Sequence, residues 1–178
     1  MPTAPAGMFS VKAVAATRTP VRVCVALLNR GEACPIHRHR PDGDQHSLPG
    51  GLLQQGEDPL AALARELNEE LALDTTGLPA PRLIGVQKQA TTRPGSDTLF
   101  RRLHLIHALN LPDYLRDRVA TAEQDAADAN RVLWLPLGES AELHLYPAAG
   151  ALLAHLASGT PATAVELPPM DDRTYNWR

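Results

Sequence analysis

A glycine turn followed by an amphipathic helix is the feature of this chain that most constrains its fold. Residues 51–73 read GLLQQGEDPLAALARELNEELAL. Asp58 is a good N-cap and Pro59 suits the first helical position, so we expect the helix to begin there. Aliphatic residues then recur at steps of three and four and predict one stripe that packs against a sheet, formed by Leu60, Leu63, Ala64, Leu67 and Leu71.

Three glutamates occupy a different face of the same helix. Glu66, Glu69 and Glu70 stand at i, i+3 and i+4, which places their carboxylates together. Like charges at such spacings repel by about a few tenths of a kcal/mol per pair. A divalent cation bound among the carboxylates would make their interaction favourable. Oxygen ligands of this kind suit Mg²⁺ or Mn²⁺. The alternative interpretation is a solvated acidic helix face.

The segment also matches a known pattern. Eight residues fall at the spacing G-x5-E-x7-R-E-U-x-E-E-x-G-U, where U is a bulky aliphatic: Gly51, Glu57, Arg65, Glu66, Leu67, Glu69, Glu70 and Leu73. This pattern resembles the signature of Nudix hydrolases, which cut a diphosphate linked to another moiety. The ninth position carries Ala72 where the family usually has glycine. Alanine in a left-handed C-cap costs on the order of 1 kcal/mol, so the departure concerns local geometry more than chemistry.

The resemblance implies a metal site and a fold. Position by position, Glu69 and Glu70 are the best candidates for metal ligands, Glu66 is a further ligand or the general base, and the carbonyl of Gly50 completes the shell around Mg²⁺ or Mn²⁺. The implied fold is α+β, a Nudix-type α/β/α sandwich with a mixed β-sheet.

Two further residues of the signature are expected to support these ligands. A guanidinium fork at Arg65 can bridge Glu57 and a helix glutamate, which would keep the acids ionised and fixed. Glu57 and Arg65 therefore belong to the predicted catalytic set with Glu66, Glu69 and Glu70. The general base varies in this family, and a loop outside the signature offers three alternatives: Glu123, Asp125 and Asp128.

The remaining pattern predicts a single domain. Apolar runs and turn signals favour strands at 21–28, 36–40, 46–48, 83–89, 99–109 and 131–137, a helix at 147–157, and helix or loop at 112–129. We expect the Nudix domain to span 21–158. Residues 1–20 read as a loose segment or an edge strand, and residues 159–178, with three prolines, read as a surface tail.

Composition excludes several classes of protein. A net charge of −3 and a pI near 6.1 give no general attraction to nucleic acid or to an anionic membrane. No apolar run is long enough to cross a bilayer, and no secretion signal is recognisable, so we expect a cytoplasmic protein. Cys24 and Cys34 are not in a C-x-x-C arrangement and are expected to be free thiols.

One basic segment stands out before the glycine turn. His37, Arg38, His39 and Arg40 alternate, and a strand would send the two arginines to one face and the two histidines to the other. Arg38 and Arg40 are candidates for binding substrate phosphates, or they protect an exposed strand edge by their charge. His37 and His39 have no evident third ligand in the sequence, which disfavours a zinc site.

Aromatic residues are few. Trp134 lies in an apolar run and is expected in the core, whereas Tyr146, Tyr175 and Trp177 could stack on a base. The C-terminal Tyr-Asn-Trp is also a candidate for contact with a second subunit in a homodimer.

The leading hypothesis is a hydrolase, dependent on a divalent metal, that cleaves a phosphoanhydride bond in a nucleoside diphosphate derivative or a nucleoside triphosphate. One alternative is a non-catalytic Nudix-fold sensor of a nucleotide sugar, which predicts loss of acids that are all present here. A second alternative is a pyrophosphohydrolase acting on RNA 5′ ends, which the acidic balance and the low aromatic content disfavour.

Overall fold

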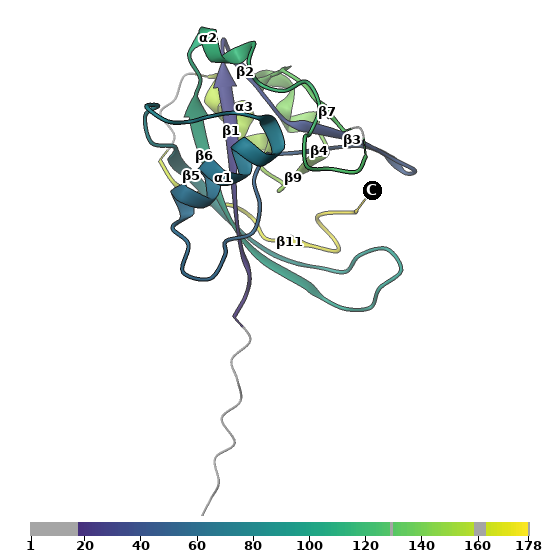
Figure 1. Cartoon of the computed structure of the whole chain (residues 1–178). Coiled ribbons are helices and arrows are strands. Elements are labelled where there is room, and N and C mark those ends of the chain that lie inside the picture. Colours follow the sequence, from purple (N-terminus) through teal and green to yellow (C-terminus); the bar gives the residue numbers. More distant parts are fainter. Residues whose placement is uncertain (1–17, 129, 159–162, 178) are drawn as a thin grey trace, which may run out of the picture.

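The computed structural model describes residues 18–128, 130–158 and 163–177 (Figure 1). Its helices are α1 (Pro59–Leu71), α2 (Asp113–Arg116) and α3 (Gly150–Ala157), with a 3₁₀ helix η1 (Leu137–Glu142). Its strands are β1 (Val21–Asn29), β2 (Glu32–Ala33), β3 (Ile36–Arg40), β4 (Gly43–Ser47), β5 (Arg82–Thr91), β6 (Phe100–Asn110), β7 (Arg131–Val132), β8 (Leu135–Pro136), β9 (Leu145–Tyr146), β10 (Val165–Glu166) and β11 (Met170–Asp171).

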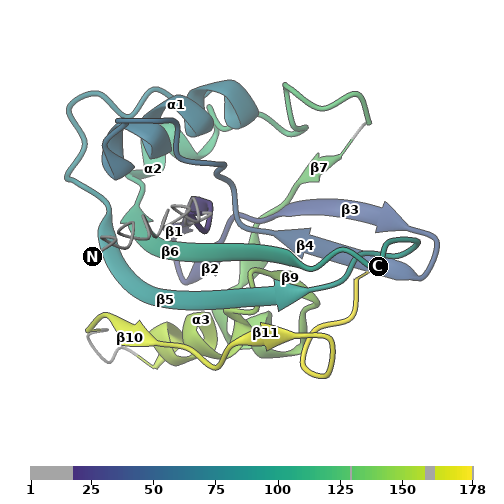
Figure 2. The same ribbon diagram turned by 90° about the horizontal axis from the view of Figure 1, so that it is seen from below.

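The strands form two mixed sheets. The larger has the order β10-β5-β6-β1-β2-β8, with β11 also paired to β5, and the smaller has the order β7-β3-β4-β9. The central β1–β6 pair is parallel, whereas β5 and β6 form a long antiparallel hairpin. Figure 2 shows α1 and α2 on one side of the larger sheet and α3 on the other. The predicted α+β sandwich is therefore confirmed.

The two faces of the larger sheet bury separate apolar cores. Leu63, Leu67 and Leu71 of α1 are fully buried against Val23, Val25 and Leu27 of β1. The opposite core joins Cys24 and Ala26 of the same strand to Leu152 and Leu153 of α3. Alternate residues of β1 thus supply both cores, as expected for a strand covered on both faces. This fixes β1 as the central strand of the sandwich.

Helix α1 begins as predicted, but its buried face differs. The Asp58 carboxylate accepts hydrogen bonds from the backbone N–H groups of Leu60 and Ala61, and Pro59 occupies the first turn. The apolar stripe was predicted to include Leu60 and Ala64, yet both are exposed. Glu66 and Glu70 are buried in their place. The helix is rotated so that these two carboxylates point inward, toward the glycine turn.

The stretch 112–129, predicted as helix or loop, contains the short α2, and the rest of its described part is irregular. Two other expectations from the sequence are corrected. The single strand at 131–137 is two short strands, β7 and β8, which belong to different sheets. Residues 163–177 are not a surface tail, because β10 and β11 both pair with β5 and Tyr175 is buried. Residues 1–17 and 159–162 lie outside the described part of the chain.

The two cysteines are buried and free. Burial raises the pKa of the Cys24 thiol to about 11 and that of Cys34 to about 12. Both thiols are therefore protonated and unreactive near neutral pH. Among the described helices, none combines the length and apolar character that a bilayer span requires.

Replacing Ala72 by glycine should stabilise the protein. Ala72 caps α1 in the left-handed region (φ 53°, ψ 28°), and its N–H donates to the carbonyl of Asn68 at 3.0 Å. Its methyl group is exposed, so little packing is lost on removal. We expect the free energy of unfolding to rise by about 1 kcal/mol in urea titrations. An unchanged or lowered value would contradict this account of the cap.

Candidate active site

The glycine turn is held against β1 by backbone hydrogen bonds. The N–H groups of Val23 and Val25 donate to the carbonyls of Gly51 and Pro49 at 2.9 and 3.0 Å. Gly50 has φ +131°, and a Cβ there would lie 2.2 Å from the Val23 carbonyl oxygen. A Cβ on Gly51 would meet the Glu66 carboxylate at 2.2 Å. Gly50 therefore requires glycine, whereas a side chain at Gly51 would displace the Glu66 carboxylate.

Glu70 is the buried acid at the centre of this region. Its side chain reaches from α1 to the turn, where the N–H of Gly50 donates to its Oε2 at 2.7 Å. Glu70 is only 7% exposed. Burial raises the pKa of its carboxyl from 4.5 to about 8, the Gly50 N–H and Arg22 oppose that shift, and Glu123 and Asp125 add to it. The site therefore disfavours negative charge unless a cation is present.

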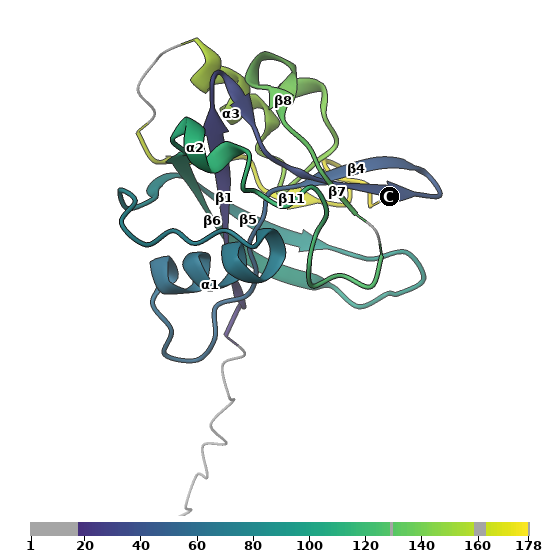
Figure 3. The same cartoon turned by 45° about the horizontal axis from the view of Figure 1, so that its top comes forward.

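The loop that precedes β7 is anchored to the end of α1. The last carbonyls of a helix have no partner within the helix and need donors from elsewhere. Here the N–H of Ala120 donates to the carbonyl of Leu71 at 3.0 Å, and the N–H of Gln124 donates to that of Glu70 at 2.9 Å. Figure 3 shows this loop passing close to α1 on its way to β7. The anchoring places Glu123 and Asp125 beside Glu70.

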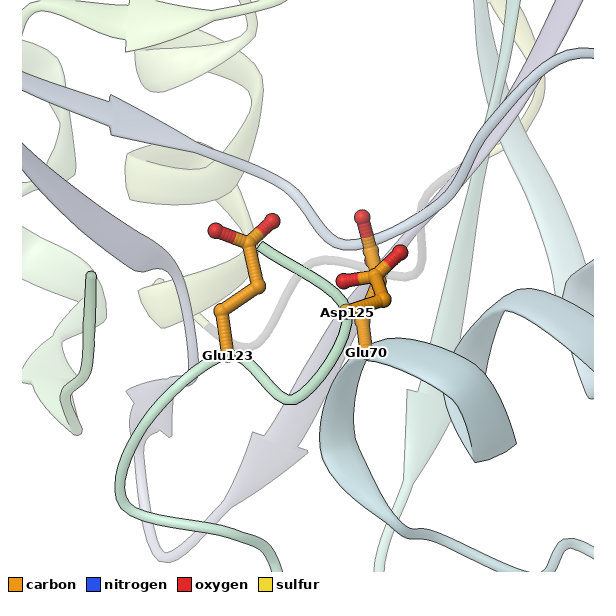
Figure 4. Close-up of side chains that lie close together, drawn as sticks. All are labelled: Glu70, Glu123 and Asp125. Atoms are coloured by element: carbon orange, nitrogen blue, oxygen red, sulfur yellow. The ribbon is translucent and has the colours of Figure 1, made fainter. Parts of the chain in front are cut away.

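Carboxylate oxygens of Glu70, Glu123 and Asp125 all lie within 4.8 Å of one another (Figure 4). Glu70 and Glu123 are buried, whereas Asp125 is exposed. Three oxygen ligands at this separation suit Mg²⁺ or Mn²⁺. Burial, and to a lesser extent the charges of Glu123 and Asp125, raise the pKa of Glu70. The residues fit a divalent cation. The sequence suggested Glu123 and Asp125 as alternatives for the base, and the structure brings them to the predicted ligand Glu70.

Arg65 binds the remaining acids of the signature. It donates from Nε to Glu57 Oε1 at 2.9 Å and from Nη1 to Glu66 at 2.6 Å and Glu69 at 3.1 Å. The predicted bridge between Glu57 and a helix glutamate is confirmed. These hydrogen bonds lower the pKa of Glu57 and raise that of Arg65. Glu66 and Glu69 therefore face Arg65, and their roles as metal ligands stay predictions.

Arg22 also belongs to this site, although the sequence did not lead us to predict it. This partly buried side chain of β1 donates from Nη2 to the carbonyls of Leu48 at 3.0 Å and Gly50 at 2.6 Å. Its Nη1 is buried and has no hydrogen-bond partner among the described residues. The carbonyl of Gly50, a predicted metal ligand, thus accepts a hydrogen bond from Arg22. The feature of the sequence that could have indicated its role is an arginine inside the apolar run VRVCVALL.

The two arginines of β3 face the loop, as their alternation predicts. Arg38 forms a hydrogen-bonded ion pair with Glu123 and also donates to the Ser47 hydroxyl. Asn130 donates to the other oxygen of Glu123. Arg40 approaches Asp128 at 4.0 Å. Phosphate binding by either arginine stays a prediction, but both lie on the side of the hairpin that faces the carboxylates.

Comparison with known proteins assigns the family. The model of the NUDIX domain family matches residues 18–156, which includes every residue of the site described above. The chain belongs to the Nudix family. Two strains of Mycobacterium tuberculosis carry a relative named "Putative 8-oxo-dGTP diphosphatase 2", 37% identical over 89 residues. That alignment covers 50% of this chain and 60% of the relative.

Solved structures support the same fold. A MutT protein from Bacillus halodurans superimposes with a TM-score of 0.56 at 14% identity, over 78% of this chain and 82% of that one. The ORF135 protein of Escherichia coli gives a TM-score of 0.53 at 22% identity, over 81% of this chain and 94% of that one. At these identities the likeness concerns the fold alone.

The aromatic residues of this Nudix protein pack on one another near the C-terminus. The ring centroids of Tyr146 and Trp177 lie 5.1 Å apart, and Tyr175 stacks on His144 at 4.7 Å. The indole N–H of Trp177 donates to Thr91. Stacking on a base stays a prediction for these rings. Trp134 is partly buried against the α1 core, with the Arg116 guanidinium 4.3 Å from its ring centre.

The raised pKa of Glu70 predicts a pH-dependent stability without metal. A carboxyl whose pKa is higher in the folded state stabilises the fold below pH 4.5 and loses that contribution as the pH rises through about 8. In chelator, wild type should therefore lose on the order of 2 kcal/mol relative to Glu70→Gln between about pH 5 and about pH 8.5. Urea unfolding of both proteins measures this difference, and a constant difference across that range would refute the assignment.

Proposed function

We propose that this Nudix protein is a hydrolase, dependent on a divalent metal, that cleaves a phosphoanhydride bond in a nucleoside triphosphate or a nucleoside diphosphate derivative. The convergence of Glu70, Glu123 and Asp125 carries this proposal. Two of these acids are buried. Arg38 and Asn130 bind Glu123, and a divalent cation would supply the positive charge that Glu70 lacks. The mycobacterial relative named as an 8-oxo-dGTP diphosphatase supports a nucleoside triphosphate as the first substrate to test.

Glu70, Glu123 and Asp125 would hold Mg²⁺ or Mn²⁺, with Glu66, Glu69 and the Gly50 carbonyl as the further ligands that the signature implies. When bound, such an ion neutralises phosphate charge and increases the acidity of water. The N–H of Gly50 orients the Glu70 carboxylate. Because Gly50 and Gly51 carry no side chain, the turn can lie directly against Val23 and the Glu66 carboxylate.

Two arginines position the acids. Arg65 holds Glu57, Glu66 and Glu69 in fixed rotamers, so Glu57 acts through Arg65 and does not reach the reacting atoms itself. Arg38 holds Glu123. An incoming phosphate could take the place of Glu123 as the partner of Arg38 once a cation balances that carboxylate, and Arg40 lies on the same face of β3 to assist.

Two carboxylates are candidates for the general base. A base must be ionised and must be reached by water. Asp125 is exposed at the edge of the cluster and meets the second condition. Glu66 lies beside Gly51 and accepts a hydrogen bond from Arg65 at 2.6 Å. Loss of activity in Asp125→Asn or Glu66→Gln that is relieved at high pH would separate the base from a ligand.

Substitution at the cluster tests the proposed activity. With saturating Mg²⁺ or Mn²⁺, Glu70→Gln and Glu123→Gln should each lower kcat by about 10²-fold or more, because each removes a charge from the site where phosphate charge develops. Glu142→Gln, an exposed acid of η1, is the matched control and should leave kcat unchanged. Phosphate and pyrophosphate release from a panel of nucleoside triphosphates and nucleoside diphosphate derivatives provides the measurement.

Two results would count against the proposal. One is near-normal kcat in both cluster variants, which would make these carboxylates structural. The other is full activity after chelation and removal of bound metal. A protein that binds nucleotides but hydrolyses none of the panel would favour the non-catalytic sensor.

A further inference from the structure

The second face of the β3–β4 hairpin carries a group of side chains unrelated to the carboxylate cluster. In the antiparallel register His37 pairs with His46, and His39 pairs with Asp44. Because residues at i and i+2 share a face, these four side chains lie on the same surface of the ribbon. Arg38 and Ser47 point to the opposite surface, where they bind each other and Arg38 binds Glu123.

Asp44 contacts both histidines of β3, and His46 packs against His37. Oδ1 of Asp44 lies 3.2 Å from Nε2 of His37 and 2.9 Å from Nδ1 of His39. The ring centroids of His37 and His46 are 5.0 Å apart. Neighbouring positions of a two-stranded ribbon are separated by roughly 5 Å across the strands and roughly 7 Å along them, so imidazole and carboxylate side chains can converge above its centre.

Part of this group is open to solvent and part is enclosed. The side chains of His39 and Asp44 are 84% and 56% exposed, whereas that of His37 is 19% exposed. His46 is partly buried, and its Nδ1 is shielded from solvent without a hydrogen-bond partner among the described residues. An ion could therefore enter from the His39 side and meet more enclosed donors beneath.

We propose that His37, His39, Asp44 and His46 form a binding site for a first-row transition metal ion, with Zn²⁺ the best fit. Three imidazoles and one carboxylate suit Zn²⁺ and its neighbours in the series, whereas Mg²⁺ prefers oxygen ligands alone. In tetrahedral zinc sites the nitrogen and oxygen ligands stand roughly 3.4 Å apart. On this hairpin one Asp44 oxygen lies at hydrogen-bonding distance from both imidazoles, 3.2 and 2.9 Å, so the carboxylate already links His37 to His39.

Asp44 supplies what the histidine pair alone lacks. His37 and His39 are two residues apart and offer no third ligand within β3, but the hairpin turn returns the chain so that Asp44 lies opposite His39. Arg131 of β7 pairs with His37 on the edge of β3 that faces away from β4. The proposed site therefore has a cationic neighbour, Arg131, as well as an anionic ligand, Asp44. Among the described residues only the carboxylate cluster has ligand atoms that all lie within 4.8 Å of one another. Binding one ion on the hairpin therefore requires rotation of the histidine side chains, which the exposure of His39 permits.

Binding of an ion at this site would stabilise the β3–β4 hairpin. An ion shared by β3 and β4 ties the two strands together near the hairpin turn (Figure 2). The opposite face of these strands carries Arg38, which positions Glu123, and Gln45, which donates to the hydroxyl of Tyr175. Zn²⁺ should therefore raise the thermal midpoint of the protein, since it binds the folded hairpin and not the unfolded chain.

Calorimetric titration of the tag-free chain with Zn²⁺, in a large excess of Mg²⁺, tests the proposal. We expect one equivalent of Zn²⁺ to bind to wild type. His39→Asn, an exposed substitution that should not disturb folding, should weaken this binding by about tenfold or more. The double variant His37→Asn/His39→Asn should abolish it. His155→Asn, an exposed histidine on α3, is the matched control and should bind as wild type does.

Glu70→Gln separates this site from the carboxylate cluster. Retained Zn²⁺ binding in Glu70→Gln, together with loss in the histidine variants and a rise in thermal midpoint confined to proteins that bind, would support the proposal. No Zn²⁺ binding to wild type would overturn it. So would binding unchanged in both histidine variants, or binding lost in Glu70→Gln alone. Circular dichroism of each variant confirms that it is folded.

Discussion

The contact between Glu70 and the glycine turn is the interaction on which the site depends. A buried carboxylate of α1 accepts the N–H of Gly50, while the turn itself is hydrogen-bonded to β1. One short contact therefore joins the helix to the central strand of the sheet. It also explains the rotation of α1, because the helix must direct Glu70 inward even though a carboxylate is costly to bury. That cost appears in the raised pKa of Glu70.

The rest of the site distributes charge around that contact. Arg65 forms ion pairs with Glu57, Glu66 and Glu69, Arg38 holds Glu123, and Arg22 binds the carbonyl of Gly50. The loop before β7 is fixed because its N–H groups satisfy the last carbonyls of α1. The C-terminal end of α1 thus carries Glu70 and also anchors the loop that places Glu123 and Asp125 beside Glu70.

The sequence predicted the local features of this site and not its long-range contacts. The start of α1 follows from Asp58 and Pro59, and the Arg65–Glu57 bridge follows from their spacing. The inward rotation of Glu66 and Glu70 could not be foreseen, because apolar periodicity alone places Leu60 and Ala64 in the stripe. The pairing of 163–177 with β5 was missed since prolines suggested a tail. Asp44 as a neighbour of His39 needed the hairpin register, which spacing along one strand does not give.

The central claim is that Glu70, Glu123 and Asp125 are gathered to hold a divalent cation. A crystal structure of the protein with Mn²⁺, analysed by anomalous scattering, tests it most directly. The account predicts a manganese peak bounded by carboxylate oxygens of these three residues, and loss of that peak in Glu70→Gln crystals grown in the same way. A peak that touches none of the three, or no peak at saturating Mn²⁺, would contradict it.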